Sequence, residues 1–301
     1  MRETGNLKMT ILTEENNHRT QDIDLKNGYE IAKLINFEDQ KVADAIQKEL
    51  KKVGEAIDLI AESFFAGGRL AYFGAGTSGR IGVLDASECV PTFGVEAELV
   101  KAYIAGGDRA LRYSVENAED DAMLGLKDLE DFAPQKNDVV VGVSASGNPK
   151  YVLAVLEKAQ KAGVHTIALS SNVEAKMKAF ADIFICPVVG PEVIAGSSRM
   201  KAGTAQKMVL NMLSTGAMIK IGKTYHNYMV DLKISNNKLF ERGCRLVREI
   251  CGISQDEAEN ILKRAGNRVK TACVMKLKNY TREAAEEELS NVGGVLRKII
   301  G

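Results

Sequence analysis

The sequence predicts an α/β protein with a doubly wound parallel sheet flanked by helices, preceded by N-terminal helices and followed by a small all-helical appendage. Short apolar runs alternate with helical patterns between residues 69 and 186, as expected of right-handed βαβ crossovers. The 301 residues, 45% of them hydrophobic, suffice for the core of one large α/β unit and exclude a disordered chain.

The chain before the first strand is polar and then helical. Residues 1 to about 27 show no regular pattern. From 28 to 65, apolar residues recur at three- and four-residue steps, which predicts a helix. Gly67 and Gly68 end this helix.

Five apolar runs predict buried strands. These strands are 69–73, 99–104, 138–143, 165–169 and 182–186. Helices are expected at about 78–89, 151–162 and 200–221, and only helical patterns remain after about residue 235. The chain therefore divides into an N-terminal extension with helices (1–50), an α/β domain (51–235) and a small helical domain (236–301).

The charge balance points to a small-molecule partner. Forty Lys and Arg residues match 40 Asp and Glu residues, so the formal net charge is zero. Proteins that bind nucleic acid normally carry a basic face, so no nucleic-acid partner is expected. The three histidines are widely separated, which argues against a zinc site or a histidine-based triad.

The cysteines and the N-terminal segment indicate the cellular compartment of the protein. The five cysteines form no CxxC pair and indicate free thiols in a reducing compartment. Segment 1–17 lacks the apolar core of a signal peptide, and no run reaches the roughly 18 apolar residues of a membrane span. We therefore expect a cytoplasmic protein with no membrane partner.

Two predicted strands end in loops rich in glycine and hydroxyl groups, Gly74–Arg80 and Ser144–Asn148. Ligands of parallel sheets bind outside the carboxyl ends of the strands. Glycine lets a ligand approach the backbone, hydroxyls donate to anionic oxygens, and the following helix N-terminus favours negative charge. The two loops together predict a phosphate-binding floor, although either one alone is consistent with a tight turn.

The first loop also contains a GxGxxG string at Gly74, Gly76 and Gly79, which is compatible with dinucleotide binding. That fingerprint needs an acidic residue at the end of the next strand, whereas Glu96 and Glu98 precede the strand here. The lysine of a P-loop is also missing. A phosphomonoester, such as a sugar phosphate, fits these loops better than a pyrophosphate.

Four longer motifs carry a family resemblance. They are GAGTSGRIGVLDASECVPTFG (74–94), VENAEDD (115–121), SASGNPKYV (144–152) and GPEVIAGSSRMKAGTAQKMVLNMLST (190–215). These motifs closely resemble the N-acetylmuramic acid 6-phosphate etherase family, bacterial enzymes with the sugar-isomerase (SIS) fold. The resemblance covers nearly the whole chain, from Leu12 to the terminal helices.

The resemblance implies a carbon–oxygen lyase that uses no metal or redox cofactor. Such an enzyme cleaves the ether between C3 of the sugar and D-lactate, by elimination and then hydration, to give N-acetylglucosamine 6-phosphate in the recycling of cell-wall sugars. It implies that Glu88 protonates the departing lactate oxygen and that Glu119 removes the C2 proton. To keep a proton near neutral pH, Glu88 should be buried at its helix end.

The residues alone leave alternatives open. Glu119 starts an acidic run, and such runs are usually solvated or lie in the first turn of a helix. Glu116 is one helical turn away and is the alternative to Glu119. It also stays open which of Glu88 and Glu119 is the acid and which is the base. Two alternatives share this fold. A non-catalytic sugar-phosphate sensor needs no pair of proton-transfer groups, and an aldose–ketose phosphate isomerase would share the base at C2 but eliminate nothing. A DNA-binding regulator is the least expected alternative.

Substrate contacts are expected from both loops and from the start of the long helix. The candidates are Thr77, Ser78, Ser144, Ser146, Gly147, Ser197, Ser198, Arg199 and Lys201. The last four have an equally good alternative as a simple helix start with charges in its first turn. The methionines Met208, Met212 and Met218 favour core packing or the interface of a homodimer over a ligand site.

Overall fold

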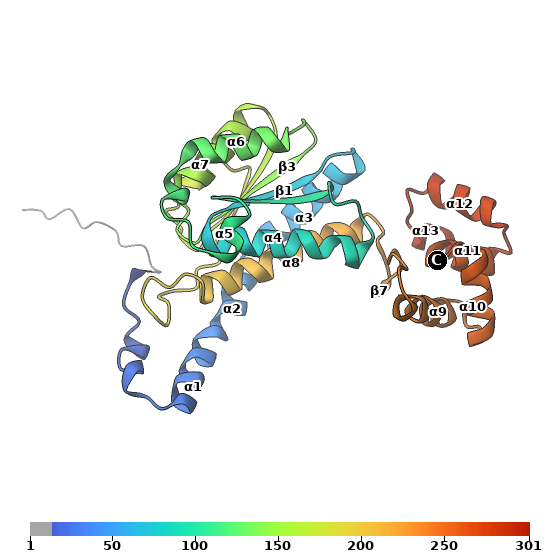
Figure 1. Cartoon of the computed structure of the whole chain (residues 1–301), viewed down its shortest axis with the longest axis horizontal. Helices are drawn as coiled ribbons and strands as arrows, with labels where there is room; N and C mark the ends of the chain where they lie inside the picture. Colours follow the sequence, from blue (N-terminus) through green and yellow to red (C-terminus); the bar gives the residue numbers. More distant parts are fainter. Residues whose placement is uncertain (1–13) are drawn as a thin grey trace, which may run out of the picture.

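The computed structural model describes residues 14–301 and contains a five-stranded parallel sheet in the order β2-β1-β3-β4-β5 (Figure 1). The strands are β1 (Leu70–Gly74), β2 (Val100–Ile104), β3 (Val139–Val143), β4 (His165–Leu169) and β5 (Ile183–Ile185). This confirms the predicted doubly wound sheet. The predicted absence of a signal peptide, and the start of the family resemblance at Leu12, concern residues outside the described part of the chain.

Helices cover both faces of the sheet. One face carries α2 (Lys41–Gln47), α3 (Leu50–Phe65), α4 (Gly76–Phe93) and α8 (Lys201–Lys220), and the other carries α6 (Ala122–Phe132) and α7 (Lys150–Lys161). Alternate residues of β1 serve the two layers, because successive side chains of a strand point to opposite faces. Leu70 and Tyr72 join the core on the α8 side, whereas Ala71 and Phe73 join the core on the α7 side.

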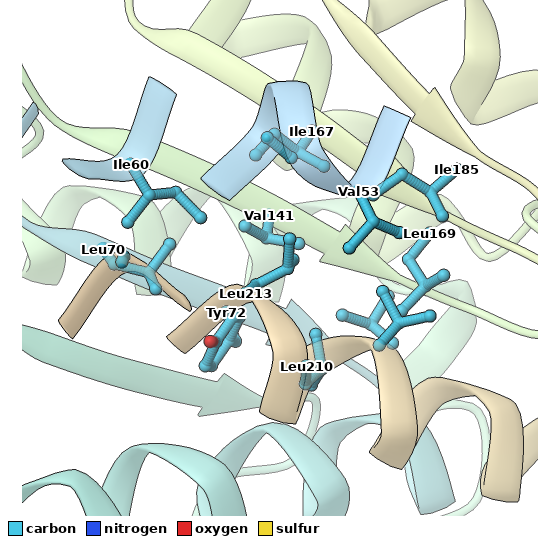
Figure 2. Close-up of a cluster of buried hydrophobic side chains, with 14 of the residues drawn as sticks. Val53, Ile60, Leu70, Tyr72, Val141, Ile167, Leu169, Ile185, Leu210 and Leu213 are labelled. Carbon is cyan, nitrogen blue, oxygen red and sulfur yellow. The ribbon is translucent and has the colours of Figure 1, made fainter. Parts of the chain in front are cut away.

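Figure 2 shows the core between the sheet and its first helical layer. Val53 and Ile60 of α3 and Leu213 of α8 lie over Val141 and Ile167 of the central strands, and all five are fully buried. Burial of each such side chain contributes roughly 1.5–3 kcal/mol. This packing holds α3 and α8 against the sheet.

The single helix predicted over 28–65 is wrong, because the chain forms three helices there. They are α1 (Gly28–Asp39), α2 and α3. Between α2 and α3, the Glu49 carboxylate accepts hydrogen bonds from the Cys186 backbone N–H at 3.0 Å and from Lys52 at 2.9 Å. Periodicity detects the common apolar stripe and misses such a bond to a residue distant in sequence.

Several short elements were not predicted. They are η2 (His18–Thr20), η3 (Ile23–Leu25), α5 (Arg109–Arg112), η4 (Ala118–Asp120), α6 and the hairpin β6 (Thr224–Tyr225) and β7 (Tyr228–Met229). The helical pattern expected before β5 is the short η5 (Lys176–Phe180). Asp121 caps α6 by accepting hydrogen bonds from the N–H groups of Met123 and Leu124. The acidic run at 119–121 thus places Glu119 and Asp120 in the first turn of η4, as is usual for such runs, and ends in a helix cap at Asp121.

The C-terminal region forms a separate helical cluster with its own core (Figure 1). Its helices are α9 (Asn237–Cys251), α10 (Gln255–Arg264), α11 (Val269–Lys278), α12 (Arg282–Asn291) and α13 (Arg297–Ile300). The connector reaches the far end of α4, where a Cβ on Gly94 would lie 2.1 Å from the Asp231 carbonyl oxygen. Within residues 14–301, no helix has the length and apolar character to cross a membrane.

Candidate active site

The two glycine- and hydroxyl-rich loops leave the sheet side by side. Gly74, at the end of β1, pairs with Val143, at the end of the neighbouring β3. The loops therefore start at the same level, and the helices that follow them, α4 and α7, both begin at this edge. Free backbone N–H groups at helix N-termini favour an anion here.

The second loop has a defined shape. The Ser144 hydroxyl accepts a hydrogen bond from the Gly147 backbone N–H at 3.0 Å, and the Ser146 hydroxyl accepts one from the Asn148 N–H at 3.4 Å. Gly147 has φ +71°, and a Cβ there would lie 2.2 Å from Cβ of Ala175. Only glycine fits this position, because both the backbone and the space exclude a side chain.

Residues after β4 support this loop from behind. The Asn172 side-chain amide donates to the Ser146 carbonyl at 2.9 Å, and the Ser170 hydroxyl donates to the Ala145 carbonyl at 3.0 Å. Both supporting side chains are buried. These bonds keep the loop in one conformation before any ligand arrives, which lowers the entropic cost of binding.

The first loop and the start of α8 come together. Ser78 is buried and Thr77 is half-buried in the first turn of α4. A Cβ on Gly203 of α8 would lie 3.4 Å from the Thr77 methyl group and 3.5 Å from the Ser198 carbonyl. The backbone of Ser198 is therefore near Thr77 of the first loop, and a contact of Ser197 or Ser198 with a substrate stays a prediction.

Lys201 does not face the two loops and is buried between α1 and α8. Its side chain is fully buried, with 0% exposure, and its Nζ donates to the Glu38 carboxylate at 2.8 Å. Glu38 is also fully buried and accepts from Arg19 at 2.6 Å and from Lys41 at 2.5 Å. A contact between Lys201 and a substrate would require this ion pair to open, while Arg199 is exposed.

Glu119 lies in η4, beyond the carboxyl end of β2. The short helix α5 before it is held to α4, because the Arg80 guanidinium donates to the carbonyls of Ala110 and Leu111, at 3.0 and 3.2 Å. η4 contacts α7, the helix that follows the second loop. Glu119 is exposed at this edge of the sheet, and so is the alternative, Glu116.

Glu88 is not brought to this edge. It lies twelve positions after Gly76, the first residue of α4, which corresponds to about 18 Å along a helix axis. Its side chain is exposed, so the burial expected of an acid is absent within one chain. In Figure 1, α4 runs toward the connector of the C-terminal helices.

Sequence reasoning missed three buried carboxylates, of which Asp85 lies one turn before Glu88. The Asp85 carboxylate accepts from the Tyr72 hydroxyl at 2.9 Å, from Asn211 at 2.9 Å and from Ser214 at 3.1 Å. Burial raises the pKa of Asp85, and the three donors offset part of this effect. These bonds tie α4 to β1 and α8.

The other two missed carboxylates are Glu38 and Glu192. Glu192 is fully buried and accepts from the backbone N–H groups of Lys201 and Ala202, both at 2.9 Å, so it caps α8. Glu192 lies within the motif 190–215. Its position within this motif could have marked Glu192 as a residue of interest. The sequence does not reveal that it caps a helix that begins nine residues later.

As a whole, this edge of the sheet can hold a phosphomonoester on hydroxyls and helix N-termini, with Glu119 at its rim. Within residues 14–301, no cluster of three or more His, Cys, Asp or Glu side chains is arranged to hold a metal ion. Fixed backbone dipoles can bind an anion without a cationic side chain.

Comparison with known proteins identifies the regions. Residues 46–160 match the glucokinase regulatory protein N-terminal SIS domain, residues 128–216 match the SIS domain, and residues 226–288 match the C-terminal lid domain of glucokinase regulatory protein. The fold is therefore of the SIS type, with a lid-like helical region after it.

Curated relatives match this chain over nearly its whole length. The chain is 50% identical over 290 residues to the N-acetylmuramic acid 6-phosphate etherase of Clostridium botulinum (strain Langeland / NCTC 10281 / Type F), covering 96% of each chain. It is 49% identical over 287 residues to the enzyme of that name from Yersinia pestis (strain Pestoides F), covering 95% of this chain and 97% of the relative. The motifs, the fold and this identity agree, and the chain belongs to the N-acetylmuramic acid 6-phosphate etherase family.

Proposed function

We propose that this protein is a lyase that cleaves the D-lactyl ether of N-acetylmuramic acid 6-phosphate, giving N-acetylglucosamine 6-phosphate and D-lactate. The observation that carries the proposal is the pair of hydroxyl-rich loops that leave neighbouring strands at one level, in a chain half identical to curated etherases over 96% of its length. The floor suits the 6-phosphate of such a sugar.

The proposed phosphate contacts come from both loops. Thr77 and Ser78 offer hydroxyls and N–H groups at the start of α4, and Ser144, Ser146 and Gly147 form the second loop. Because the Gly147 N–H already donates to Ser144, it orients that hydroxyl and binds a phosphate oxygen only if this bond is shared. Ser197 and Ser198, just before α8, are proposed to contact the phosphate from the side of Thr77.

Lys201 receives a positioning role in this proposal. Its ammonium group is engaged by Glu38, and its backbone N–H is capped by Glu192 at 2.9 Å. It therefore fixes the first turn of α8, and with it the serines of the preceding loop, without touching the substrate.

The proposed chemistry needs two proton-transfer groups. Ring opening exposes a C1 aldehyde, which acidifies the C2 proton. Glu119 removes this proton, Glu88 protonates the departing lactate oxygen, and water then adds to the C2–C3 double bond at C3. Because Glu88 lies away from this edge in one chain, this role requires that the second copy of the homodimer proposed below supplies it. Positioned acid–base groups contribute typically 10²–10⁴-fold per transfer.

Incubation with N-acetylmuramic acid 6-phosphate in deuterated water tests the proposal. We expect free D-lactate, measured enzymatically, and deuterium at C2 of the product, measured by mass spectrometry. If no D-lactate is released at high enzyme concentration, the proposed etherase function is refuted. Interconversion of aldose and ketose without lactate release would identify an isomerase, and binding without turnover would identify a sensor.

Replacing Glu119 with Gln tests the base. Exchange at C2 and lactate release should both fall by about 10²-fold or more. Asp120→Asn is the matched control, because Asp120 is the adjacent exposed carboxylate of η4, and it should retain activity. If E119Q keeps C2 exchange and loses lactate release, the roles of the two glutamates are reversed.

We further propose a cytoplasmic homodimer. All five cysteines are free thiols, which supports a reducing compartment. Met208 and Met212 line an open hollow on α8, whereas Met218 is fully buried. The first two methionines therefore support a subunit interface, and Met218 belongs to the core.

A further inference from the structure

A polar hollow lies where the C-terminal helices meet the connector, and it is separate from the two loops of the sheet. Its volume is about 580 Å³, and its walls come from Gly94 at the end of α4, from residues 230–234 of the connector and from residues 266–271 at the start of α11. The residues that line it include none from the loops 74–80 and 144–148. A cavity of this size can hold a small molecule.

The start of α11 forms one wall of this hollow. Its first three residues, Val269, Lys270 and Thr271, line the hollow and are buried. The first N–H groups of a helix have no partner inside the helix, and the N-cap residue Arg268 makes no side-chain capping bond. The Thr271 side chain is also buried, and its hydroxyl makes no hydrogen bond within residues 14–301. Buried polar groups normally have a partner, so these groups point to a ligand from outside the chain.

The hollow carries more positive than negative charge. Lys270 and Lys223 share a single carboxylate, because both pair with Asp231, at 2.5 and 3.2 Å. The other charged residues of the lining are Lys233, Arg268, Glu96 and Glu286. The lining therefore contains four cationic side chains and three carboxylates, which leaves one positive charge without a counter-charge.

The ammonium group of Lys270 would gain most from a second anion. Its side chain is only 9% exposed. Burial lowers the pKa of Lys270, Asp231 acts in the opposite direction, and the neighbouring Lys223 lowers the pKa further. A buried charge is costly unless it is paired, and an anion in the hollow completes the pairing.

We infer that this hollow is a second ligand site, which binds the phosphate or carboxylate group of a small molecule between the N-terminus of α11 and the ammonium groups of Lys223 and Lys270. Helix N-termini and cationic side chains both favour such an anion. Gly94 ends α4 and lines the same hollow, so a ligand bound here fastens the C-terminal helices to α4. The site does not depend on the proposed etherase function.

Hydrogen exchange of the full chain, measured by mass spectrometry, tests this site. The probes are inorganic phosphate and D-lactate, with sodium chloride added to keep the ionic strength constant. Amides of residues 266–271 should exchange more slowly, by about 10-fold at a probe concentration of about ten times Kd. Protection by phosphate alone identifies a phosphate ligand, and protection by D-lactate alone identifies a carboxylate ligand. Phosphate bound at the two loops would instead protect the starts of α4 and α7.

Two variants remove parts of the site without removing the bond between Lys270 and Asp231. Lys223→Met removes one ammonium group, and the protection of 266–271 should disappear. Thr271→Val keeps every charge and removes the hydroxyl, so binding should weaken by about 10-fold. Lys220→Met is the matched control, because Lys220 pairs with Asp58 and does not line the hollow, and it should keep full protection.

The outcomes separate this site from the proposed function. If neither probe protects residues 266–271, the inference is overturned, and unchanged protection in both K223M and T271V would overturn it as well. Neither result affects the etherase function, because release of D-lactate from N-acetylmuramic acid 6-phosphate tests that function separately.

Discussion

Gly147 and Gly163 share a left-handed backbone, with φ +71° and +72°, and differ in what surrounds them. A Cβ at Gly147 would lie 2.2 Å from Cβ of Ala175, whereas nothing lies within 4 Å of a Cβ at Gly163. A substitution at Gly163 therefore reports the cost of backbone strain alone, and a substitution at Gly147 reports backbone strain together with crowding in the second loop.

Gly147→Ala should damage both stability and function. The left-handed backbone costs about 1–2 kcal/mol, overpacking adds about 1–3 kcal/mol, and displacement of the loop should lower kcat/KM by about 10²-fold. Gly163→Ala should show only the first cost and keep kcat/KM. Denaturant unfolding and D-lactate release measure the two effects, and equal kcat/KM for the two variants would contradict a role of this loop in the site.

Single residues also mark the limit of sequence reasoning. The loop of Ser144, Ser146 and Gly147 was predictable because it follows a recognisable strand and its bonds are local, whereas its contact with a phosphate stays a prediction. The surroundings of Lys201 were not, because its partner Glu38 lies 163 residues away. A lysine in the first turn of a helix has the same local pattern whether it faces a ligand or a buried carboxylate.

Among the elements, the buried Glu38 joins α1 to α8. Burial alone would raise its pKa, but hydrogen bonds from Arg19, Lys201 and Lys41 outweigh burial and leave the pKa well below its usual value of 4.5. A lowered pKa means that the carboxylate stabilises the fold at pH values above 4.5, and that this stabilisation is lost as pH falls.

Glu38→Gln should therefore lower the free energy of unfolding near pH 7 by about 3–5 kcal/mol, since it leaves the buried Lys201 without its counter-charge. The difference from wild type should shrink as pH falls below 4.5. Glu30→Gln, an exposed capping residue of the same helix, should cost about 1 kcal/mol or less. A pH-independent difference for E38Q in urea titrations would contradict this account.

The elements themselves were largely predictable. The five strands have strong apolar runs, and their predicted bounds differ from the observed ones by one residue or less. The single helix over 28–65 was wrong, because the chain forms three helices there, and α6 was missed although Asp121 is a suitable cap. Periodicity reports which face is buried, and it does not report where one helix ends and the next begins on the same apolar stripe.

For the whole molecule, a buried lysine fastens the C-terminal helices to the connector. Lys270 donates to Asp231 at 2.5 Å and to the Gly294 carbonyl at 2.7 Å. Asp231 in turn pairs with Lys223 at 3.2 Å, and its carbonyl contacts the end of α4 at Gly94. The helix that carries Glu88 and the lid-like region therefore meet at Asp231.

Lys270→Met should loosen this junction without unfolding the sheet domain. Asp231 keeps only Lys223, and hydrogen exchange in the region 226–301 should become faster, whereas exchange in β1 and β3 should stay slow. Lys278→Met, at an exposed position of the same helix, should leave both regions unchanged. Faster exchange across the entire chain of K270M would show that the lysine supports global stability instead.

The sequence by itself determined the class of fold, the order of the strands along the chain, the two glycine- and hydroxyl-rich loops and the family, because each depends on local patterns or on motifs of adjacent residues. Only the tertiary structure decided that Lys201 is buried against Glu38 and that Asp85 and Glu192 are internal. These features depend on which surfaces meet after folding. Local patterns record how a residue is exposed or spaced along its own element, and they do not record the partner that the fold brings to it.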